Sequence, residues 1–357
     1  MNKKKLKLGV IFGGMSGEHE VSLQSAINVI KAVNTEKYEI FLLGINRDGK
    51  FGVYEGPIEL ISSGEWEKEV KFFSKTFPES FSDMDAVFPV LHGPYGEDGT
   101  IQGMLELMRI PYVGCDVISS AIGMDKEVSK KLFGLAGIKT GPYFLCSKSE
   151  IKNNMNICLN KIETNLKYPV FVKPANMGSS VGITKVHSRM ELEKALVFAA
   201  RYDKKVIIEQ GIDCRELEVS VLGNEKVEAS CVGEILPSNE FYDYEAKYKA
   251  GDNSKLLIPA PLEKEQEETI RKAAVEAFKA IGGCGMGRVD FFMDKSSGEI
   301  LINEINTIPG FTKISMYPKL WEASGIGYNG LVDRLIELAF DRSREKEEVI
   351  AHGFSES

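Results

Sequence analysis

Short apolar runs alternate with amphipathic segments through the first third of the chain. The runs at 7–12, 39–45 and 86–91 predict buried strands, and the apolar positions of 21–33 recur with the period of a helix. Strands that alternate with helices form parallel sheets with crossover connections. This part of the chain is therefore predicted to be an α/β unit with a parallel sheet.

Two loops that follow predicted strands, at 13–18 and 92–99, are rich in glycine and polar residues. In open parallel sheets, ligands bind at the loops that leave the carboxyl ends of the strands, so both loops are candidate ligand sites. Farther along, a helix is predicted from about Ser120 to Ala136, because it is followed by Gly137, a common residue just beyond a helix C-terminus.

A second arrangement begins near residue 168. Strands are predicted at 169–173, 216–222 and 227–235, and an amphipathic helix is predicted at 263–281. The stretch 236–258 is polar, rich in aromatic residues and without a period of its own. A connection this long is usually functional, as in an active-site lid, or disordered.

Carboxylates on two neighbouring strands give the strongest chemical signal in the sequence. The strands are joined by a turn near Ser297, so an antiparallel hairpin puts Asp290 opposite Glu304. Period-two alternation puts Arg288 on the face of Asp290, and Asn306 on that of Glu304. Oxygen ligands without His or Cys suit magnesium. A surface hairpin with solvated charges is the alternative, which the apolar neighbours of the carboxylates disfavour.

A second signal lies at Lys173, which ends a predicted strand before the small-residue loop 175–182. A lysine, backbone N–H groups and hydroxyls together suit a phosphate, but the Walker A order is absent and an ordinary turn is an equal alternative. Lys126 on its predicted helix is a weaker candidate still. The pair Gly13-Gly14 lacks the Gly-x-Gly-x-x-Gly pattern, which counts against a dehydrogenase.

Composition narrows the classes of partner. The 357 residues carry 44 Lys and Arg against 52 Asp and Glu, a formal net charge of −8. That balance argues against nucleic acid as the main partner, which requires a cationic face. The six cysteines are scattered without a Cys-x-x-Cys pair and the four histidines are spread out, so we expect reduced thiols in a cytoplasmic protein. The apolar run at 8–12 is too short for a signal peptide and no stretch is long enough to span a membrane.

Several segments form an ordered series of motifs. They are 13–22, 91–93, 96–100, 124–126, 171–174, 178–182, 242–248, 287–290 and 303–310. Each is modest evidence alone, but in this order they resemble the ATP-grasp D-alanine–D-alanine ligases over essentially the whole chain.

The resemblance implies an α/β fold with the three-domain ATP-grasp architecture. The domains implied are an N-terminal α/β domain at 1–120, a central ATP-grasp domain at 121–212, and a C-terminal catalytic domain at 213–345 that carries the lid 236–258. The charged segment after Asp341 is expected to lack regular structure, and 346–357 to form a tail.

The resemblance also implies that ATP is held between the central and C-terminal domains as a co-substrate. The ATP-binding residues implied are Lys126, Lys173, Ser179, Ser180, Val181, Glu209, Gln210, Ile212, Glu216 and Lys247. The lysines and the loop 179–182 would contact phosphates, 209–212 would line the adenine pocket, and Glu216 would take the ribose hydroxyls. Two Mg²⁺ ions, with Mn²⁺ as an alternative, would be held by Asp290, Glu304 and Asn306.

The implied reaction joins two D-alanines through a D-alanyl phosphate, for peptidoglycan synthesis. Glu18 would bind the ammonium group of the first D-alanine, with His92 nearby. Arg288 and the Gly310 N–H would face the reacting carboxylate. Ser315, followed by Met316, would take the carboxylate of the second amino acid. A hydrogen-bonded trio of Ser179, Tyr248 and Glu216 would hold the lid.

Alternatives remain at this stage. Lys313-Ile314 and Met316 flank Ser315 where several relatives carry other residues, so a D-alanine–D-serine ligase stays open, whereas Lys247-Tyr248 disfavours D-lactate. From another class, the chain could be a nucleotide-binding sensor without catalysis. The partners expected are D-alanine and ATP, with no nucleic acid or membrane, and the family suggests a homodimer.

Overall fold

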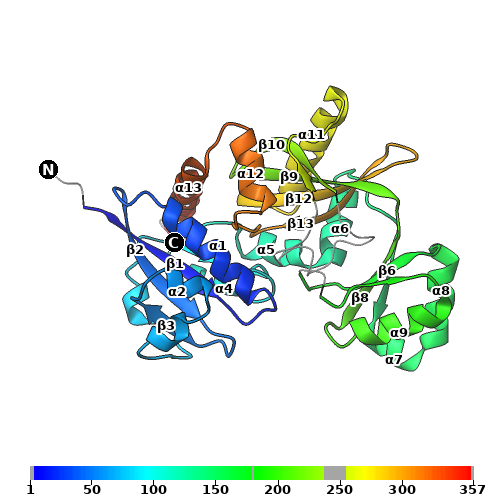
Figure 1. The fold of residues 1–357 in the computed structure, drawn as a ribbon, viewed down its shortest axis with the longest axis horizontal. Helices are drawn as coiled ribbons and strands as arrows, with labels where there is room; N and C mark the ends of the chain where they lie inside the picture. Colours follow the sequence, from blue (N-terminus) through cyan, green and yellow to red (C-terminus); the bar gives the residue numbers. More distant parts are fainter. Residues whose placement is uncertain (1–3, 179–180, 237–254, 355–357) are drawn as a thin grey trace.

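The computed structural model describes residues 4–178, 181–236 and 255–354, without the side chains of 350–354. The chain forms three lobes, each built on one sheet and numbered in chain order. In space, the sheet of the third, C-terminal lobe lies between the sheets of the first and second lobes (Figure 1). Within the described ranges, no helix has the length and apolarity needed to cross a membrane.

The first lobe is built on a four-stranded sheet of order β3-β2-β1-β4. Its elements are β1 (Leu6–Gly13), α1 (His19–Ala32), β2 (Tyr38–Ile45), β3 (Phe51–Tyr54), α2 (Glu59–Ser62), α3 (Trp66–Glu69), the 3₁₀ helix η1 (Glu79–Phe81), β4 (Ala86–Val90) and α4 (Thr100–Leu107). Strand β1 pairs in parallel with β2 and β4, which confirms the predicted parallel sheet. The edge strand β3, which was not predicted, is antiparallel to β2.

The second lobe is an antiparallel sheet of order β5-β8-β6-β7. The elements leading to it and forming it are α5 (Val117–Met124), α6 (Lys126–Leu135), β5 (Tyr143–Ser147), α7 (Lys148–Asn153), α8 (Met155–Asn165), β6 (Val170–Pro174), β7 (Thr184–Val186), α9 (Arg189–Ala199) and β8 (Lys205–Gln210). Apolar side chains from these strands and from α8 and α9 give the lobe a core of its own.

The single helix predicted from Ser120 to Ala136 is wrong, because the chain leaves the helical conformation at Asp125. The Asp125 side chain accepts hydrogen bonds from the N–H groups of Glu127 and Val128 and so caps α6. An aspartate in this position satisfies N–H donors that a helix start otherwise leaves without partners. The break fixes where α6 begins, and with it the direction of Lys126.

The third lobe is an antiparallel sheet of order β11-β10-β9-β12-β13. Its elements are β9 (Cys214–Gly223), β10 (Glu228–Leu236), β11 (Lys255–Leu257), α11 (Lys264–Ala280), β12 (Gly285–Asp294), β13 (Ile300–Asn306), α12 (Met316–Ala323) and α13 (Tyr328–Phe354). The predicted connection 236–258 is shorter than expected, because Leu236 and Lys255 pair across β10 and β11.

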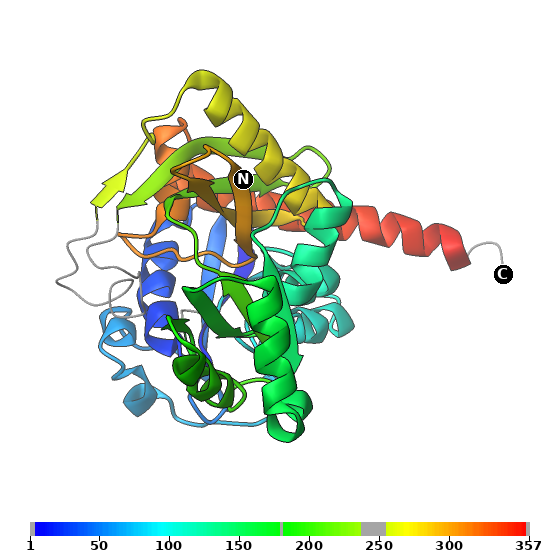
Figure 2. The ribbon, with the colours of Figure 1, turned by 90° about the vertical axis from the view of Figure 1, so that its right-hand side faces the viewer.

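One apolar core joins the first and third lobes. It contains Leu8 and Phe88 of the first sheet, Tyr317 and Trp321 of α12, and Leu335 of α13. Helix α13 contacts α1, β4 and β12, and its C-terminal part projects from the body (Figure 2). The segment after Asp341 was predicted to be irregular, and the structure corrects this: α13 continues to Phe354.

Candidate active site

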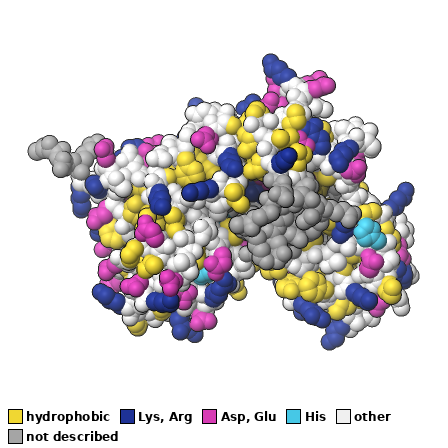
Figure 3. Space-filling model, viewed as in Figure 1, with side chains coloured by type: hydrophobic (Ala, Val, Ile, Leu, Met, Phe, Trp, Pro, Cys, Tyr) yellow, Lys and Arg dark blue, Asp and Glu magenta, His cyan; other side chains and the backbone are white. Residues whose placement is uncertain are grey.

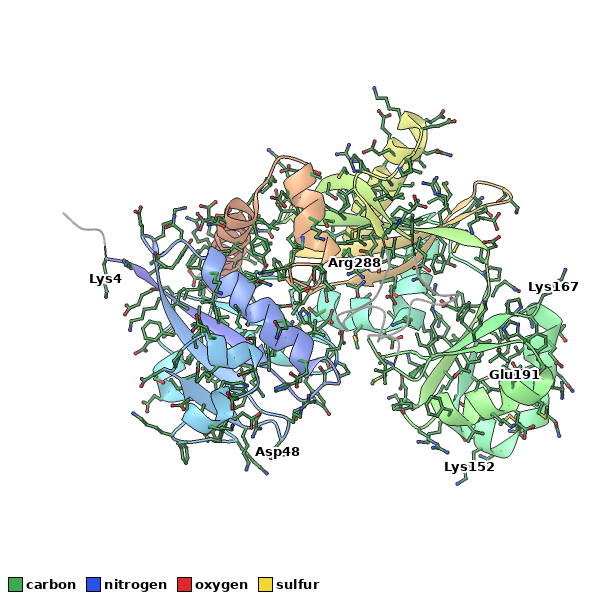
Figure 4. The ribbon with its side chains drawn as sticks, in the orientation of Figure 1. Lys4, Asp48, Lys152, Lys167, Glu191 and Arg288 are labelled. Atoms are coloured by element: carbon green, nitrogen blue, oxygen red, sulfur yellow. The ribbon has the colours of Figure 1, made fainter. Side chains whose placement is uncertain are left out.

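The β12–β13 hairpin has the predicted register. Asp290 lies opposite Glu304 and Arg288 lies opposite Asn306, with a bulge directly after Asp290. Arg288 donates from Nε to Asp290 Oδ1 and from Nη2 to Asp290 Oδ2, both at 2.7 Å. Its Nε also lies 3.0 Å from Oε2 of Glu218 on β9. In Figure 4, Arg288 lies in the middle of the molecule, between the first and second lobes.

Asn306 completes this cluster from the neighbouring strand. Its Nδ2 donates to Asp290 Oδ2 at 3.1 Å. Two carboxylates and one amide oxygen are therefore available within one cross-strand group, and such hard oxygen donors fit magnesium. In the described part of the chain, no three His, Cys, Asp or Glu side chains group closely enough to hold a metal, so an ion here requires Asn306 and further oxygen ligands.

Lys126 connects the cluster to the second lobe. Its Nζ lies 3.3 Å from Glu304 Oε2 and donates to the carbonyl of Met177 at 2.9 Å. Met177 lies in the predicted phosphate loop, so one buried ammonium group contacts both the hairpin and that loop. From the sequence, Lys126 is only a weak candidate, because helix-surface lysines are usually solvated.

Glu209 on β8 is buried between two lysines. Its Oε2 pairs with Lys173 of β6, and its Oε1 lies 2.8 Å from Nζ of Lys130. Burial alone would raise the pKa of Glu209, but the two ammonium groups outweigh burial and hold the pKa below its usual range. Lys130 was not predicted as a site residue, since nothing in the local pattern of α6 distinguishes it from Lys131.

The other residues predicted for the adenine pocket continue from β8. The Gln210 side chain forms two hydrogen bonds with the backbone of Lys167, at 2.8 Å and 2.6 Å. A nucleotide would therefore contact the backbone of Gln210 and not its side chain. Residues 210–213 and 294–296 line an open hollow of about 600 Å³. This hollow contains none of the lysines and carboxylates above. Of the residues predicted for the adenine pocket, Gln210 and Ile212 border it.

Glu18 brings three loops together. It is buried at the start of α1. A Cβ atom added to Gly93 would lie 2.5 Å from Glu18 Oε2, and one added to Gly178 would lie at the same distance. The carboxylate thus lies against the backbone of the 92–99 loop and of the loop leading to Ser179. These contacts link the first and second lobes.

His92 is buried at the same edge of the first sheet, just after the end of β4, which runs parallel to β1. Its Nε2 is 3.0 Å from Ser25 Oγ, and its Nδ1 is 3.0 Å from the carbonyl oxygen of Ile308. Burial lowers the pKa of His92 to about 4, so its imidazole is neutral at physiological pH. His92 therefore offers this site hydrogen bonds without adding a charge.

Glu97 is a further buried acid, which lies in the motif 96–100 and for which the sequence predicts no role. Gly93 N–H donates to its Oε1 at 2.7 Å, and Ile308 N–H to its Oε2 at 3.4 Å. Burial, together with the nearby Glu18, raises the pKa of Glu97 to about 8. Glu97 and His92 both contact Ile308 and so tie the first lobe to the loop after β13.

Gly310 and Ser315 lie close together after that strand. A Cβ on Gly310 would meet Ser315 Oγ at 2.6 Å, and Ser315 Oγ accepts from the N–H of Thr312 at 3.0 Å. Ser315 precedes α12 as its N-cap. The side chain of Met316 is buried with Ile235 and Leu320, so a substrate would meet its backbone rather than its side chain.

The remaining predicted residues are placed as follows. Val181 is described, and its N–H donates to the carbonyl of Gly178 at 3.2 Å. Glu216 lies on β9 opposite Ile235 of β10. Ser179, Ser180, Lys247 and Tyr248 lie outside the described residues.

Comparison with known proteins finds two family models that match successive parts of the chain. Residues 7–115 match the family model for the D-ala D-ala ligase N-terminus, and residues 132–337 match that for the C-terminus. The chain is 54% identical over 356 residues to a D-alanine–D-alanine ligase of Thermoanaerobacter sp. (strain X514), covering 96% of this chain and 99% of that protein. It is 50% identical to the D-alanine–D-alanine ligase of Acetivibrio thermocellus, with 96% and 97% covered.

Solved structures agree with the sequence comparisons. The VanG D-Ala:D-Ser ligase from Enterococcus faecalis matches with a TM-score of 0.84 and 41% identity, over 94% of this chain and 100% of that one. The D-alanine–D-alanine ligase from Coxiella burnetii matches with a TM-score of 0.84 and 35% identity, over 98% of both chains. From the site, the domain matches and these relatives together, the chain belongs to the D-alanine–D-alanine ligase family and has its ATP-grasp fold.

Proposed function

We propose that this chain joins two molecules of D-alanine into D-alanyl-D-alanine, with ATP converted to ADP and phosphate, as a step of peptidoglycan precursor synthesis. The observation that carries the proposal is the meeting of Lys126 with Glu304. Lys126 lies at the start of α6, and its ammonium group contacts both the loop after β6 in the second lobe, at the Met177 carbonyl, and the carboxylate cluster of the third lobe. Phosphoryl transfer depends mainly on positioning and electrostatic stabilisation, which such a junction can provide.

The nucleotide would lie between the second and third lobes. Lys126 and Lys173 would contact its phosphates, together with Lys247 and the loop 179–182. Residues 209–212 would border the adenine, and Glu216 the ribose. The support is that Lys173 and Glu209 meet beside the hairpin cluster, where both are buried.

Magnesium would be held by Asp290, Glu304 and Asn306, with Mn²⁺ as an alternative. The family implies two ions. When bound, magnesium neutralises phosphate charge and brings the γ-phosphate near an attacking carboxylate. Arg288 is already fixed on Asp290 and is therefore a pre-organised cation beside that position.

The first D-alanine would bind where Glu18 and His92 meet the third lobe. Glu18 would pair with its ammonium group, while neutral His92 would not repel it. The carboxylate would attack the γ-phosphorus, the bond from that phosphorus to the β,γ-bridging oxygen would break, and ADP would leave as D-alanyl phosphate forms. The amine of the second D-alanine would then attack the carbonyl carbon, and phosphate would leave. Arg288 and the Gly310 N–H would stabilise the oxyanion formed in that second step.

The second substrate has two candidates, D-alanine and D-serine, which differ by one hydroxyl group. Its carboxylate would meet Ser315 and the start of α12. The 41% identity to a D-Ala:D-Ser ligase makes D-serine the second candidate. Ser179 and Tyr248, with Glu216, would hold the lid during both steps.

Phosphate release from ATP and magnesium tests the proposal, measured with D-alanine alone, with added D-serine, with added D-lactate and with L-alanine as a control. Products are identified by mass. D-Alanyl-D-alanine from D-alanine alone is the expected result. Release only with D-serine would assign the chain to the D-alanine–D-serine ligases, and ATP binding without turnover would make it a sensor. We further propose a cytoplasmic homodimer, testable by light scattering and fractionation.

A further inference from the structure

Helix α6 carries two buried lysines one turn apart. The side chains of Lys126 and Lys130 are 10% and 3% exposed, whereas that of Lys131 is 59% exposed. Residues four apart lie on one face of a helix. Lys126 uses this face to reach Glu304. Lys130 reaches β8 and β13. The proposed function assigns it no contact with phosphate or substrate.

Lys130 contacts both strands through its ammonium group. Its Nζ lies 2.8 Å from Glu209 Oε1 on β8 and donates to the carbonyl oxygen of Asn303 on β13 at 3.0 Å. It also lies 6.0 Å from the centre of the Tyr143 ring. Asn303 directly precedes Glu304. The Lys130 side chain therefore connects β8, which carries Glu209, to β13, which carries Glu304 of the carboxylate cluster.

The charges around Glu209 give this contact a second consequence. Glu209 is paired with Lys173 on one oxygen and with Lys130 on the other. The group of three carries one net positive charge. If Lys173 turns toward a phosphate, Glu209 keeps Lys130 as its counter-ion. Without Lys130, Lys173 would be the only ion-pair partner of Glu209 among the described residues. Moving Lys173 to a phosphate would then leave a buried carboxylate without that partner, which is costly.

We propose that Lys130 is a positioning residue for ATP, which pairs with Glu209 so that Lys173 is available to the nucleotide phosphates. This inference rests on the proposed phosphate role of Lys173. It makes Lys130 act through Glu209 and not by touching the nucleotide.

A purely structural lysine would give a different pattern of effects. Loss of such a residue would lower stability and turnover together, whatever occupies position 209. If Lys130 instead serves as the second counter-ion of Glu209, its loss should mainly weaken ATP binding. That loss of affinity should disappear when Glu209 is replaced by an uncharged residue. A double-mutant cycle measures this difference directly.

The experiment compares Lys130→Met, Lys130→Arg, Glu209→Gln and the double variant Lys130→Met/Glu209→Gln in the full chain. Lys131→Met is the matched control from the exposed side of α6. ATP affinity is measured by calorimetry with magnesium, and KM is measured for ATP and for D-alanine. Lys130→Met is expected to weaken ATP binding about tenfold, with KM for D-alanine changed by less than about twofold. Lys130→Arg is expected to recover most of the affinity, and Lys131→Met to retain it.

In the Glu209→Gln background, loss of Lys130 is expected to cost less than about threefold in ATP affinity. An equal cost in both backgrounds, or unchanged ATP affinity in a folded Lys130→Met, would overturn the inference. If Lys130→Met does not fold, the double variant still decides, because it removes both charges and leaves no unpaired carboxylate: ATP affinity there more than about tenfold below that of Glu209→Gln contradicts the inference.

Lys173→Met separates this inference from the proposed function. Weaker ATP binding in Lys173→Met with normal binding in Lys130→Met would overturn only the positioning role. Unchanged ATP binding in Lys173→Met would remove its phosphate role and the inference with it.

Discussion

Arg288 and Asp290 are joined on one face of β12 by two hydrogen bonds of 2.7 Å. Such paired bonds fix the plane of a guanidinium group as well as its position. Glu218 on β9 also contacts Nε of Arg288. Asp290 and Glu218 thus orient Arg288, and a fixed orientation is the property required of a group that stabilises charge in a transition state.

Arg288→Lys should retain the positive charge and lose this orientation, because an ammonium group cannot form the two parallel bonds. We expect kcat to fall by about 10²–10³-fold, measured as phosphate release at saturating substrates. Arg215→Lys is the matched control, since Arg215 forms the same paired bonds with Glu234 at 2.8 Å and 2.7 Å in the same sheet. Equal losses of kcat in both variants would argue against a role for Arg288 in catalysis.

Glu304→Gln should remove one metal ligand and the partner of Lys126 while preserving side-chain size. Turnover is expected to drop by about 100-fold or more, and part of it should return at high magnesium concentration. Circular dichroism checks that the fold is intact. Glu299→Gln serves as the control, because Glu299 lies in the hairpin turn and pairs there with Lys139. Near-normal activity of Glu304→Gln at low magnesium would exclude Glu304 from the metal site.

The hairpin cluster could be predicted because its geometry follows from local rules. A turn near Ser297 and period-two alternation together place Asp290 opposite Glu304. The bulge after Asp290 could not be predicted. It lies between the turn and this pair, because Phe291 pairs with Ile302, and its one-residue shift brings Glu304 opposite Asp290.

The contact of Lys130 with Glu209 could not be predicted in the same way. It joins a helix to a strand 79 residues later, and it depends on the order β5-β8-β6-β7, which local periodicity does not encode. The position of the buried lysines could not be predicted from charge either. Acidic and basic side chains are interspersed on the face drawn in Figure 3, and the net charge of the chain does not indicate where buried lysines cluster.

Gly44→Ala should destabilise the first lobe. A Cβ on Gly44 would lie 2.0 Å from a ring carbon of Trp66, and Trp66 is fully buried. Forcing a methyl group into such a packed site costs about 1–3 kcal/mol, seen as a lower midpoint in urea unfolding. Gly103→Ala is the opposite case, because no atom lies within 4 Å of its added Cβ on helix α4. That variant should gain about 0.5–1 kcal/mol, and a similar loss in both would refute the packing argument.

Glu97 makes stability depend on pH in a defined direction. Burial and the nearby Glu18 raise its pKa from 4.5 in an ordinary environment to about 8 in the folded protein. Between these values the folded protein holds a proton that the unfolded chain has released. Stability contributed by this proton is complete below pH 4.5 and is lost as the pH rises through 8.

Glu97→Gln tests this directly, because glutamine keeps the shape of the protonated acid and cannot ionise. From pH 5 to 8, the wild-type free energy of unfolding should fall relative to that of Glu97→Gln, by up to about 1.4 kcal/mol per pH unit. His92, whose lowered pKa acts in the opposite direction below pH 6.5, is present in both proteins and largely cancels in the comparison. Urea unfolding at a series of pH values provides the measurement. Parallel curves for the two proteins would mean that Glu97 is ionised in the folded state and that its contact with Glu18 is relieved by another group.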